Sequence, residues 1–124
     1  MNSKVFFVIR ILLGLMVLVF GLNKFLQFIP PFELNEAGQN YFMALTSTQT
    51  MTMVAVVEIA AGIALITNKF GALMSVILMS VSVNAVLFHA TLAPEGIAPA
   101  LGLLLLNILV LVGYKSRYEG MLKA

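Results

Sequence analysis

Residues 54–65 read VAVVEIAAGIAL, an apolar segment interrupted by a single carboxylate, Glu58. The whole chain shares this character: of its 124 residues, 61% are hydrophobic and 10% are charged, and the mean hydropathy is +1.06. A soluble domain of this size needs a polar surface, and such a composition leaves too few polar residues to build one. The sequence therefore predicts insertion into a lipid bilayer.

Four apolar runs are long enough to cross a bilayer, whose hydrocarbon core of about 30 Å takes roughly 20 helical residues. The runs lack the polar–apolar alternation of barrel strands, and short connections make consecutive helices antiparallel neighbours. We predict an all-α membrane protein, an antiparallel bundle of four transmembrane helices with a short interfacial helix between helices 1 and 2. The predicted parts of this single domain, residues 1–124, are spans at 5–25, 49–67, 70–92 and 98–114, an external loop with the short helix at 26–48, and a cytoplasmic tail at 115–124.

Three local signals predict where the first elements begin and end. Pro30 and Pro31 are expected to end the first helix, because proline lacks an amide hydrogen and restricts the residue before it. The stretch Glu36–Leu45 is too polar to span and is expected to form the short helix in the outer interface. The sequence TSTQ at residues 46–49 has the spacing of a capping box, so the second span is expected to start near Ser47.

The basic residues predict the orientation of the chain. Lys and Arg divide six to one between the two ends of the predicted bundle, with Lys24 alone on the minority side. The positive-inside rule then places both termini in the cytoplasm. The net charge of +2 and the pI of about 9.2 reflect this basic fringe, and they give no reason to expect a nucleic-acid partner. The chain has no cysteine, which excludes disulfides and a dithiol redox relay.

Glu58 lies about 10 Å below the expected outer surface, at 1.5 Å per helical residue. A charge near mid-membrane costs roughly 2.5–3.5 kcal/mol, so its carboxylate is expected to face protein or water and to have a partner. Stripes of small residues on the first two helices allow close approach, and Glu58 is expected to pair with Lys24, with Arg10, or with both. The stripes are Arg10, Gly14, Gly21 and Lys24 on the first helix and Ala55, Glu58, Ala61 and Gly62 on the second.

Further polar residues in the third and fourth spans extend this candidate site. His89 lies near the outer end of the third span, with Asn84 before it, and Asn107 lies in the middle of the fourth. We predict a polar pocket in the outer half of the bundle. The candidate catalytic residues are Glu58 and His89, and the candidate ligand-binding residues are Arg10, Lys24, Asn84 and Asn107.

Each of these residues also has a structural interpretation. The pair of Glu58 with a cation can fix helix register, and His89 can bond to headgroups or to the adjacent loop. Asn84 and Asn107 can join helices, and Lys24 can extend its ammonium to the outer headgroups. One histidine and one intramembrane glutamate make a poor metal site, so no metal is predicted.

The spacing of these residues resembles the DoxX family of small membrane proteins. That family has an Arg and a Gly early in helix 1, a G-x-x-K near its end, an E-x-x-x-G in helix 2 and a polar end to helix 3. The corresponding residues here are Arg10, Gly14, GLNK at 21–24, EIAAG at 58–62 and His89. The resemblance implies a four-helix bundle in a bacterial inner (plasma) membrane. Some relatives are subunits of quinone-linked oxidoreductases, notably of thiosulfate oxidation, and others are linked to oxidative-stress complexes.

Three functions follow as hypotheses. In the first, the chain is a small quinone-binding subunit: Glu58 and His89 relay protons, and Lys24 or Arg10 polarises a quinone oxygen or binds an anionic donor. No covalently bound cofactor, haem, flavin or iron–sulfur motif is expected, so electrons would come from a redox partner protein or from the substrate, and whether the chain is itself an enzyme stays open. The second is binding or transport of a small ligand, for which a homodimer is expected. The third is a non-catalytic scaffold or assembly factor in the bilayer.

Overall fold

The regular structure of the protein is helical in the part of the chain that the computed structural model describes, residues 1–30 and 33–124. The long helices are α1 (Ser3–Leu26), α3 (Thr50–Thr67), α4 (Gly71–Leu92) and α5 (Ile97–Gly113). The shorter elements are α2 (Glu36–Ser47) and the 3₁₀ turns η1 (Pro94–Gly96) and η2 (Lys115–Tyr118).

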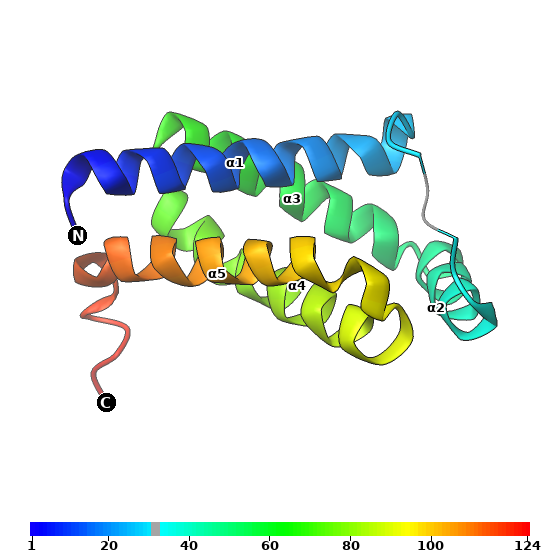
Figure 1. The fold of residues 1–124 in the computed structure, drawn as a ribbon. Coiled ribbons are helices and arrows are strands. Elements are labelled where there is room, and N and C mark those ends of the chain that lie inside the picture. Colours follow the sequence, from blue (N-terminus) through cyan, green and yellow to red (C-terminus); the bar gives the residue numbers. More distant parts are fainter. Residues whose placement is uncertain (31–32) are drawn as a thin grey trace.

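Four segments of the described chain are long and apolar enough to span a membrane: α1, α3, α4, and η1 together with α5. They form a bundle in which consecutive spans run in opposite directions, and both termini lie at one end (Figure 1). Large apolar side chains such as Phe7, Leu12, Ile63 and Leu105 point outward and are about half exposed, which suits a surface solvated by lipid. The structure thus confirms the predicted all-α bundle of four antiparallel transmembrane helices.

Helices α1 and α3 come so close at their crossing that backbone atoms of each lie against a glycine of the other. A Cβ atom on Gly62 would lie 2.8 Å from the Gly14 carbonyl oxygen, and one on Gly14 would lie 3.2 Å from the Gly62 carbonyl oxygen. Small residues permit this approach, and dispersion contacts between the two backbones replace those of side chains. The two predicted stripes therefore do face each other.

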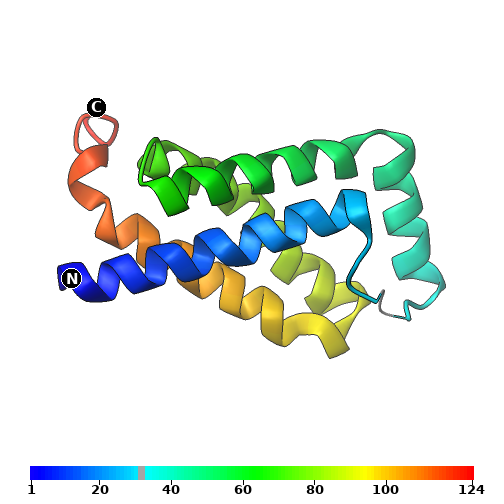
Figure 2. The same ribbon diagram turned by 90° about the horizontal axis from the view of Figure 1, so that it is seen from above.

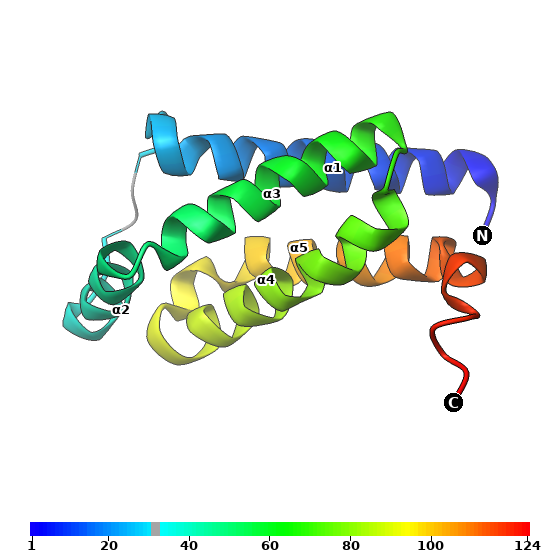
Figure 3. The same cartoon turned by 180° about the vertical axis from the view of Figure 1, so that it is seen from behind.

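A compact apolar core joins all four spans. The spans α1, α3, α4 and α5 contribute its fully buried members, which are Leu13, Val17, Ala61, Leu65, Leu78 and Val110. Figure 3 shows α3 and α4 leading away from their tight turn on one side of the bundle. This core fixes the depth at which the polar side chains of each helix lie.

Helix α2 lies across the end of the bundle opposite the termini (Figure 2). Its N-cap residue Asn35 accepts a hydrogen bond from the Gly38 amide and donates one to the Leu92 carbonyl at the end of α4. Tyr41 stacks on Phe88 with ring centroids 5.1 Å apart, and Phe42 meets the same ring edge-on. The predicted short helix exists, and one of its faces packs on the bundle.

Two helix ends differ from the expectations. Helix α1 ends at Leu26 rather than at the prolines, because Gln27 adopts a left-handed conformation (φ 53°) and Asn23 Oδ1 accepts a hydrogen bond from the Ile29 amide. Pro31, the second proline of that expectation, lies outside the described residues.

The second difference is the start of the second span. Ser47 belongs to α2, and α3 begins at Thr50 after Gln49, which has a φ of 63°. The hydroxyl of Thr48 donates a hydrogen bond to the Ala44 carbonyl, in the last turn of α2, and does not cap α3. The same threonine–serine sequence therefore closes one helix rather than opening the next.

Candidate functional site

The functional candidate with the clearest geometry is an ion pair between α1 and α3. Lys24 Nζ lies 2.5 Å from Glu58 Oε1, and the side chains of Lys24 and Glu58 are 24% and 3% exposed. No hydrogen-bond donor in the described residues meets the Oε1 atom with suitable geometry, so the ammonium is its one close partner. The acid is thus enclosed by protein, while its cation remains partly accessible.

Glycine makes room for this pair. A Cβ atom on Gly21, three residues before Lys24, would lie 3.0 Å from the Cβ of Glu58 and 2.8 Å from a side-chain carbon of Ile59. Because Gly21 has no side chain, the Cβ of Glu58 can lie directly against the backbone of α1. The G-x-x-K spacing sets the small residue and the cation one helical turn apart, on the same face.

Arg10 binds the end of α3 and does not join the ion pair. Its guanidinium donates hydrogen bonds to the carbonyl oxygens of Leu65, in the last turn of α3, and of Ile66, the latter at 3.4 Å. It forms no ion pair with Glu58 among the described residues. The side chain is 6% exposed and extends from α1 to the C-terminal end of α3, where the helix dipole favours a cation. Of the pairings left open for Glu58, the structure has the one with Lys24, because the carbonyls at the end of α3 are nearer partners for Arg10.

Asn107 joins α4 and α5 rather than lying beside the ion pair. Its Oδ1 accepts a hydrogen bond of 2.7 Å from the Ser82 hydroxyl, and its Nδ2 donates one of 3.0 Å to the Ser75 carbonyl. All three residues are fully buried. Both polar atoms of the Asn107 amide are therefore hydrogen-bonded within the protein. This agrees with the interpretation that Asn107 joins two helices.

His89 and Asn84 both lie where α4 approaches α2 and η1. The Nδ1 atom of His89 lies 3.1 Å from the Ala93 carbonyl oxygen; because a carbonyl only accepts, Nδ1 is the donor of this bond. Asn84 is exposed and donates to the Tyr41 hydroxyl at 3.0 Å. The structure therefore brings Lys24 and Glu58 together, and it gives His89, Asn84, Asn107 and Arg10 other hydrogen-bond partners.

A second polar cluster, at the end of the bundle with the termini, was not predicted. The Tyr114 hydroxyl donates to Asn68 Oδ1 at 2.5 Å, and the Tyr118 hydroxyl donates to the Ala72 carbonyl at 2.8 Å and lies 3.0 Å from Ser75 Oγ. Burial raises the pKa of both tyrosine hydroxyls. The spacing of four between Tyr114 and Tyr118 was a usable signal, because it places both rings on one side of the chain as it leaves α5.

Two comparisons with known proteins gave nothing, and the third identifies the family. No curated protein and no solved structure matches the chain. The DoxX family model matches residues 5–91, which is more than two thirds of the chain and includes the Lys24–Glu58 pair. The chain therefore belongs to the DoxX family.

Proposed function

We propose that the protein is a small membrane subunit of a quinone-linked oxidoreductase, with the Lys24–Glu58 pair as its functional centre. The observation that carries the proposal is the uneven burial of the pair: the carboxylate is almost fully enclosed, whereas the ammonium is about a quarter exposed. A fully enclosed pair could not reach a ligand, whereas this ammonium is partly accessible. An accessible ammonium with an acid behind it can meet a ligand oxygen and move a proton.

The chemical groups around the pair are suited to a quinone head group. A quinone presents carbonyl oxygens on an apolar ring, and when bound it supplies two-electron chemistry coupled to proton uptake. Lys24 can donate a hydrogen bond to such an oxygen, and Glu58 can hold or release the proton that accompanies it. The neighbouring positions, Gly21, Ala55 and Ile59, are apolar or small and exclude water from the carboxylate. His89 is a second candidate relay at the same end of the bundle.

Electrons have to come from outside this chain, because it has no cysteine and no haem, flavin or iron–sulfur motif. We therefore place the protein beside a redox partner or an anionic donor, in a bacterial inner membrane with both termini in the cytoplasm. The pair then lies in the outer half of the bilayer. The excess of basic residues at the end with the termini supports this orientation.

The test compares two variants of the acid in membranes that contain the protein and its partners. Glu58→Gln keeps the size of the side chain but cannot exchange a proton, and we expect it to lower quinone reduction by thiosulfate at least about 10² fold, the usual contribution of a positioned acid or base. Glu58→Asp keeps the acid and should retain measurable activity. Thermal unfolding of both variants controls for the fold, and activity of Glu58→Gln equal to that of the unmodified protein would refute the proposal.

A second candidate, a scaffold whose ion pair only sets helix register, is favoured by the position of Glu58 against Gly21 in the contact between α1 and α3. In that case Glu58→Gln and Glu58→Asp lose stability and activity in parallel. Small-ligand transport, the remaining hypothesis, predicts uptake by proteoliposomes that contain this chain alone.

A further inference from the structure

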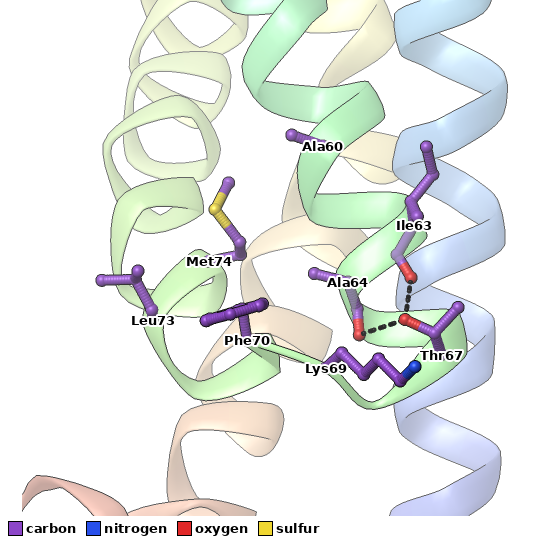
Figure 4. Close-up of a pocket in the computed structure, with 8 residues that line it drawn as sticks. All are labelled: Ala60, Ile63, Ala64, Thr67, Lys69, Phe70, Leu73 and Met74. Carbon is purple, nitrogen blue, oxygen red and sulfur yellow. Dashed lines mark hydrogen bonds between the residues drawn. The ribbon is translucent and has the colours of Figure 1, made fainter.

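Two open apolar grooves lie side by side at the end of the bundle that holds the termini, away from the Lys24–Glu58 pair. The first, of about 540 Å³, runs between α3 and α4 and is lined by Ala60, Ile63, Ala64, Leu73 and Met74 (Figure 4); we call it the α3–α4 groove. The second, of about 480 Å³, lies between α4 and the segment after α5 and includes Val76 and Met121; we call it the tail groove.

A ridge of two exposed apolar side chains separates the grooves. Phe70 and Leu73 line both of them. Phe70 is 78% exposed and has a φ of 61°, a left-handed conformation that is costly for a bulky residue. The tight turn between α3 and α4 holds this ring out from the bundle, into the region that lipid occupies.

Each groove has one cation at its border and no carboxylate in its lining. Lys69 borders the α3–α4 groove and Arg117 borders the tail groove. In residues 1–30 and 33–124 the one ion pair is Lys24–Glu58, so neither Lys69 nor Arg117 is neutralised by a carboxylate. A basic residue at headgroup depth beside an apolar groove is the arrangement that attracts an anionic lipid, at about 1 kcal/mol per cation.

The length of the α3–α4 groove suits an acyl chain. Ala60 and Thr67 are separated by seven residues of α3, or about 10 Å at 1.5 Å per residue, against about 15 Å for the hydrocarbon of one leaflet. A second copy of the protein is a poorer occupant, because a two-fold interface on this face would gather the cations of both copies with no carboxylate in the groove linings to pair with them.

We propose that the two grooves bind one anionic diacyl phospholipid, with its acyl chains on either side of the Phe70–Leu73 ridge, its phosphate at Lys69, and Arg117 as a second cation. The lipid would brace the turn between α3 and α4, which also carries the Tyr114–Asn68 hydrogen bond. This site is independent of the proposed redox function.

Native mass spectrometry of the protein released from nanodiscs tests the proposal, with equal amounts of phosphatidylglycerol and phosphatidylcholine as the probe lipids. The unmodified protein is expected to retain phosphatidylglycerol preferentially. Lys69→Gln should lower that preference about fivefold, the equivalent of one interfacial cation. The matched control is Lys4→Gln, which removes a lysine at the same end of the bundle but outside both grooves.

A second pair of variants tests the groove itself. Ala60→Phe fills the α3–α4 groove and should lower the retention of both lipids, whereas Ala90→Phe, on the exposed surface of α4 at the other end, should leave it unchanged. Circular dichroism confirms that each variant is folded. Equal retention of the two lipids by the unmodified protein, equal losses in Lys69→Gln and Lys4→Gln, or lipid retention in Ala60→Phe equal to that in Ala90→Phe would each overturn the proposal. A change from two protein copies to one in Ala60→Phe, with lipid retention unchanged, would assign the groove to a second copy instead.

Discussion

Gly62 lies where α1 and α3 come closest, and its replacement by alanine tests whether this contact holds the bundle together. The added Cβ would lie 2.8 Å from the Gly14 carbonyl oxygen and from the Leu18 Cβ, and 3.0 Å from the Leu18 Cα. Favourable carbon contacts lie at about 3.5–4.0 Å, so the two helices have to separate by several tenths of an ångström. Overpacking of this kind costs about 1–3 kcal/mol of unfolding free energy.

Gly102→Ala is the matched control. It makes the same chemical change in the middle of α5, where an added Cβ would meet no atom within 4 Å. Alanine is favoured over glycine inside a helix by about 0.8–1.0 kcal/mol, and this gain applies to both variants. The difference in unfolding free energy between Gly102→Ala and Gly62→Ala is therefore expected to equal the contact cost, about 1–3 kcal/mol.

Unfolding of the detergent-solubilised protein by increasing fractions of dodecyl sulfate, followed by far-ultraviolet circular dichroism, measures this difference. We expect Gly62→Ala to unfold at a lower fraction than the unmodified protein or close to it, and Gly102→Ala at a higher one. If Gly62→Ala were as stable as Gly102→Ala, the close approach of α1 and α3 described here would be refuted.

The other predictions concern the buried polar contacts. Arg10→Met removes the donors to the Leu65 and Ile66 carbonyls and should lower the unfolding free energy by about 1.5–3 kcal/mol in the same dodecyl sulfate assay; no loss would show that these bonds do not stabilise the end of α3. Asn107→Leu should cost about 0.6–2 kcal/mol, and a gain in stability would argue against its role between α4 and α5. Burial raises the pKa of the Tyr118 hydroxyl above its ordinary 10.0, because it disfavours the charged form. The neutral hydroxyl therefore contributes to the stability of the folded state below pH 10.0, and this contribution is lost as the pH rises above 10.0. Tyr118→Phe should therefore reduce the loss of unfolding free energy between about pH 9 and pH 11 by removing this titration, and an unchanged pH dependence would contradict the assignment.

The sequence was sufficient to predict the spans and the helix pair that forms the site. Apolar runs of the right length define α1, α3, α4 and α5 because the bilayer imposes one thickness on each. The 100° rotation per residue places Gly14 and Gly21 on one face of α1 and Glu58 and Gly62 on one face of α3, and the structure joins those faces. One turn separates Gly21 from Lys24, so the contact of Lys24 with Glu58 follows from the same geometry.

The roles of single polar residues were harder to predict, because they depend on backbone groups that the side-chain pattern does not show. Arg10 was a candidate partner for Glu58, but the carbonyls at the end of α3 lie within its reach and lack partners in their own helix. The second span was expected to start near Ser47, yet Ser47 lies in α2 and the Thr48 hydroxyl bonds back to the Ala44 carbonyl. Such choices between a near carbonyl and a distant side chain are decided by the tertiary arrangement.

The proposed function requires that the acid at position 58 take part in proton transfer and do more than pair with Lys24. The double variant Lys24→Glu/Glu58→Lys tests it most directly, because it keeps the ion pair but moves the carboxylate onto α1. Its rate of quinone reduction should be measured beside those of the unmodified protein and Glu58→Gln, in membranes with equal amounts of folded protein. We predict a folded protein with a rate as low as that of Glu58→Gln. A rate restored to that of the unmodified protein would show that only the pairing matters, and would contradict the claim.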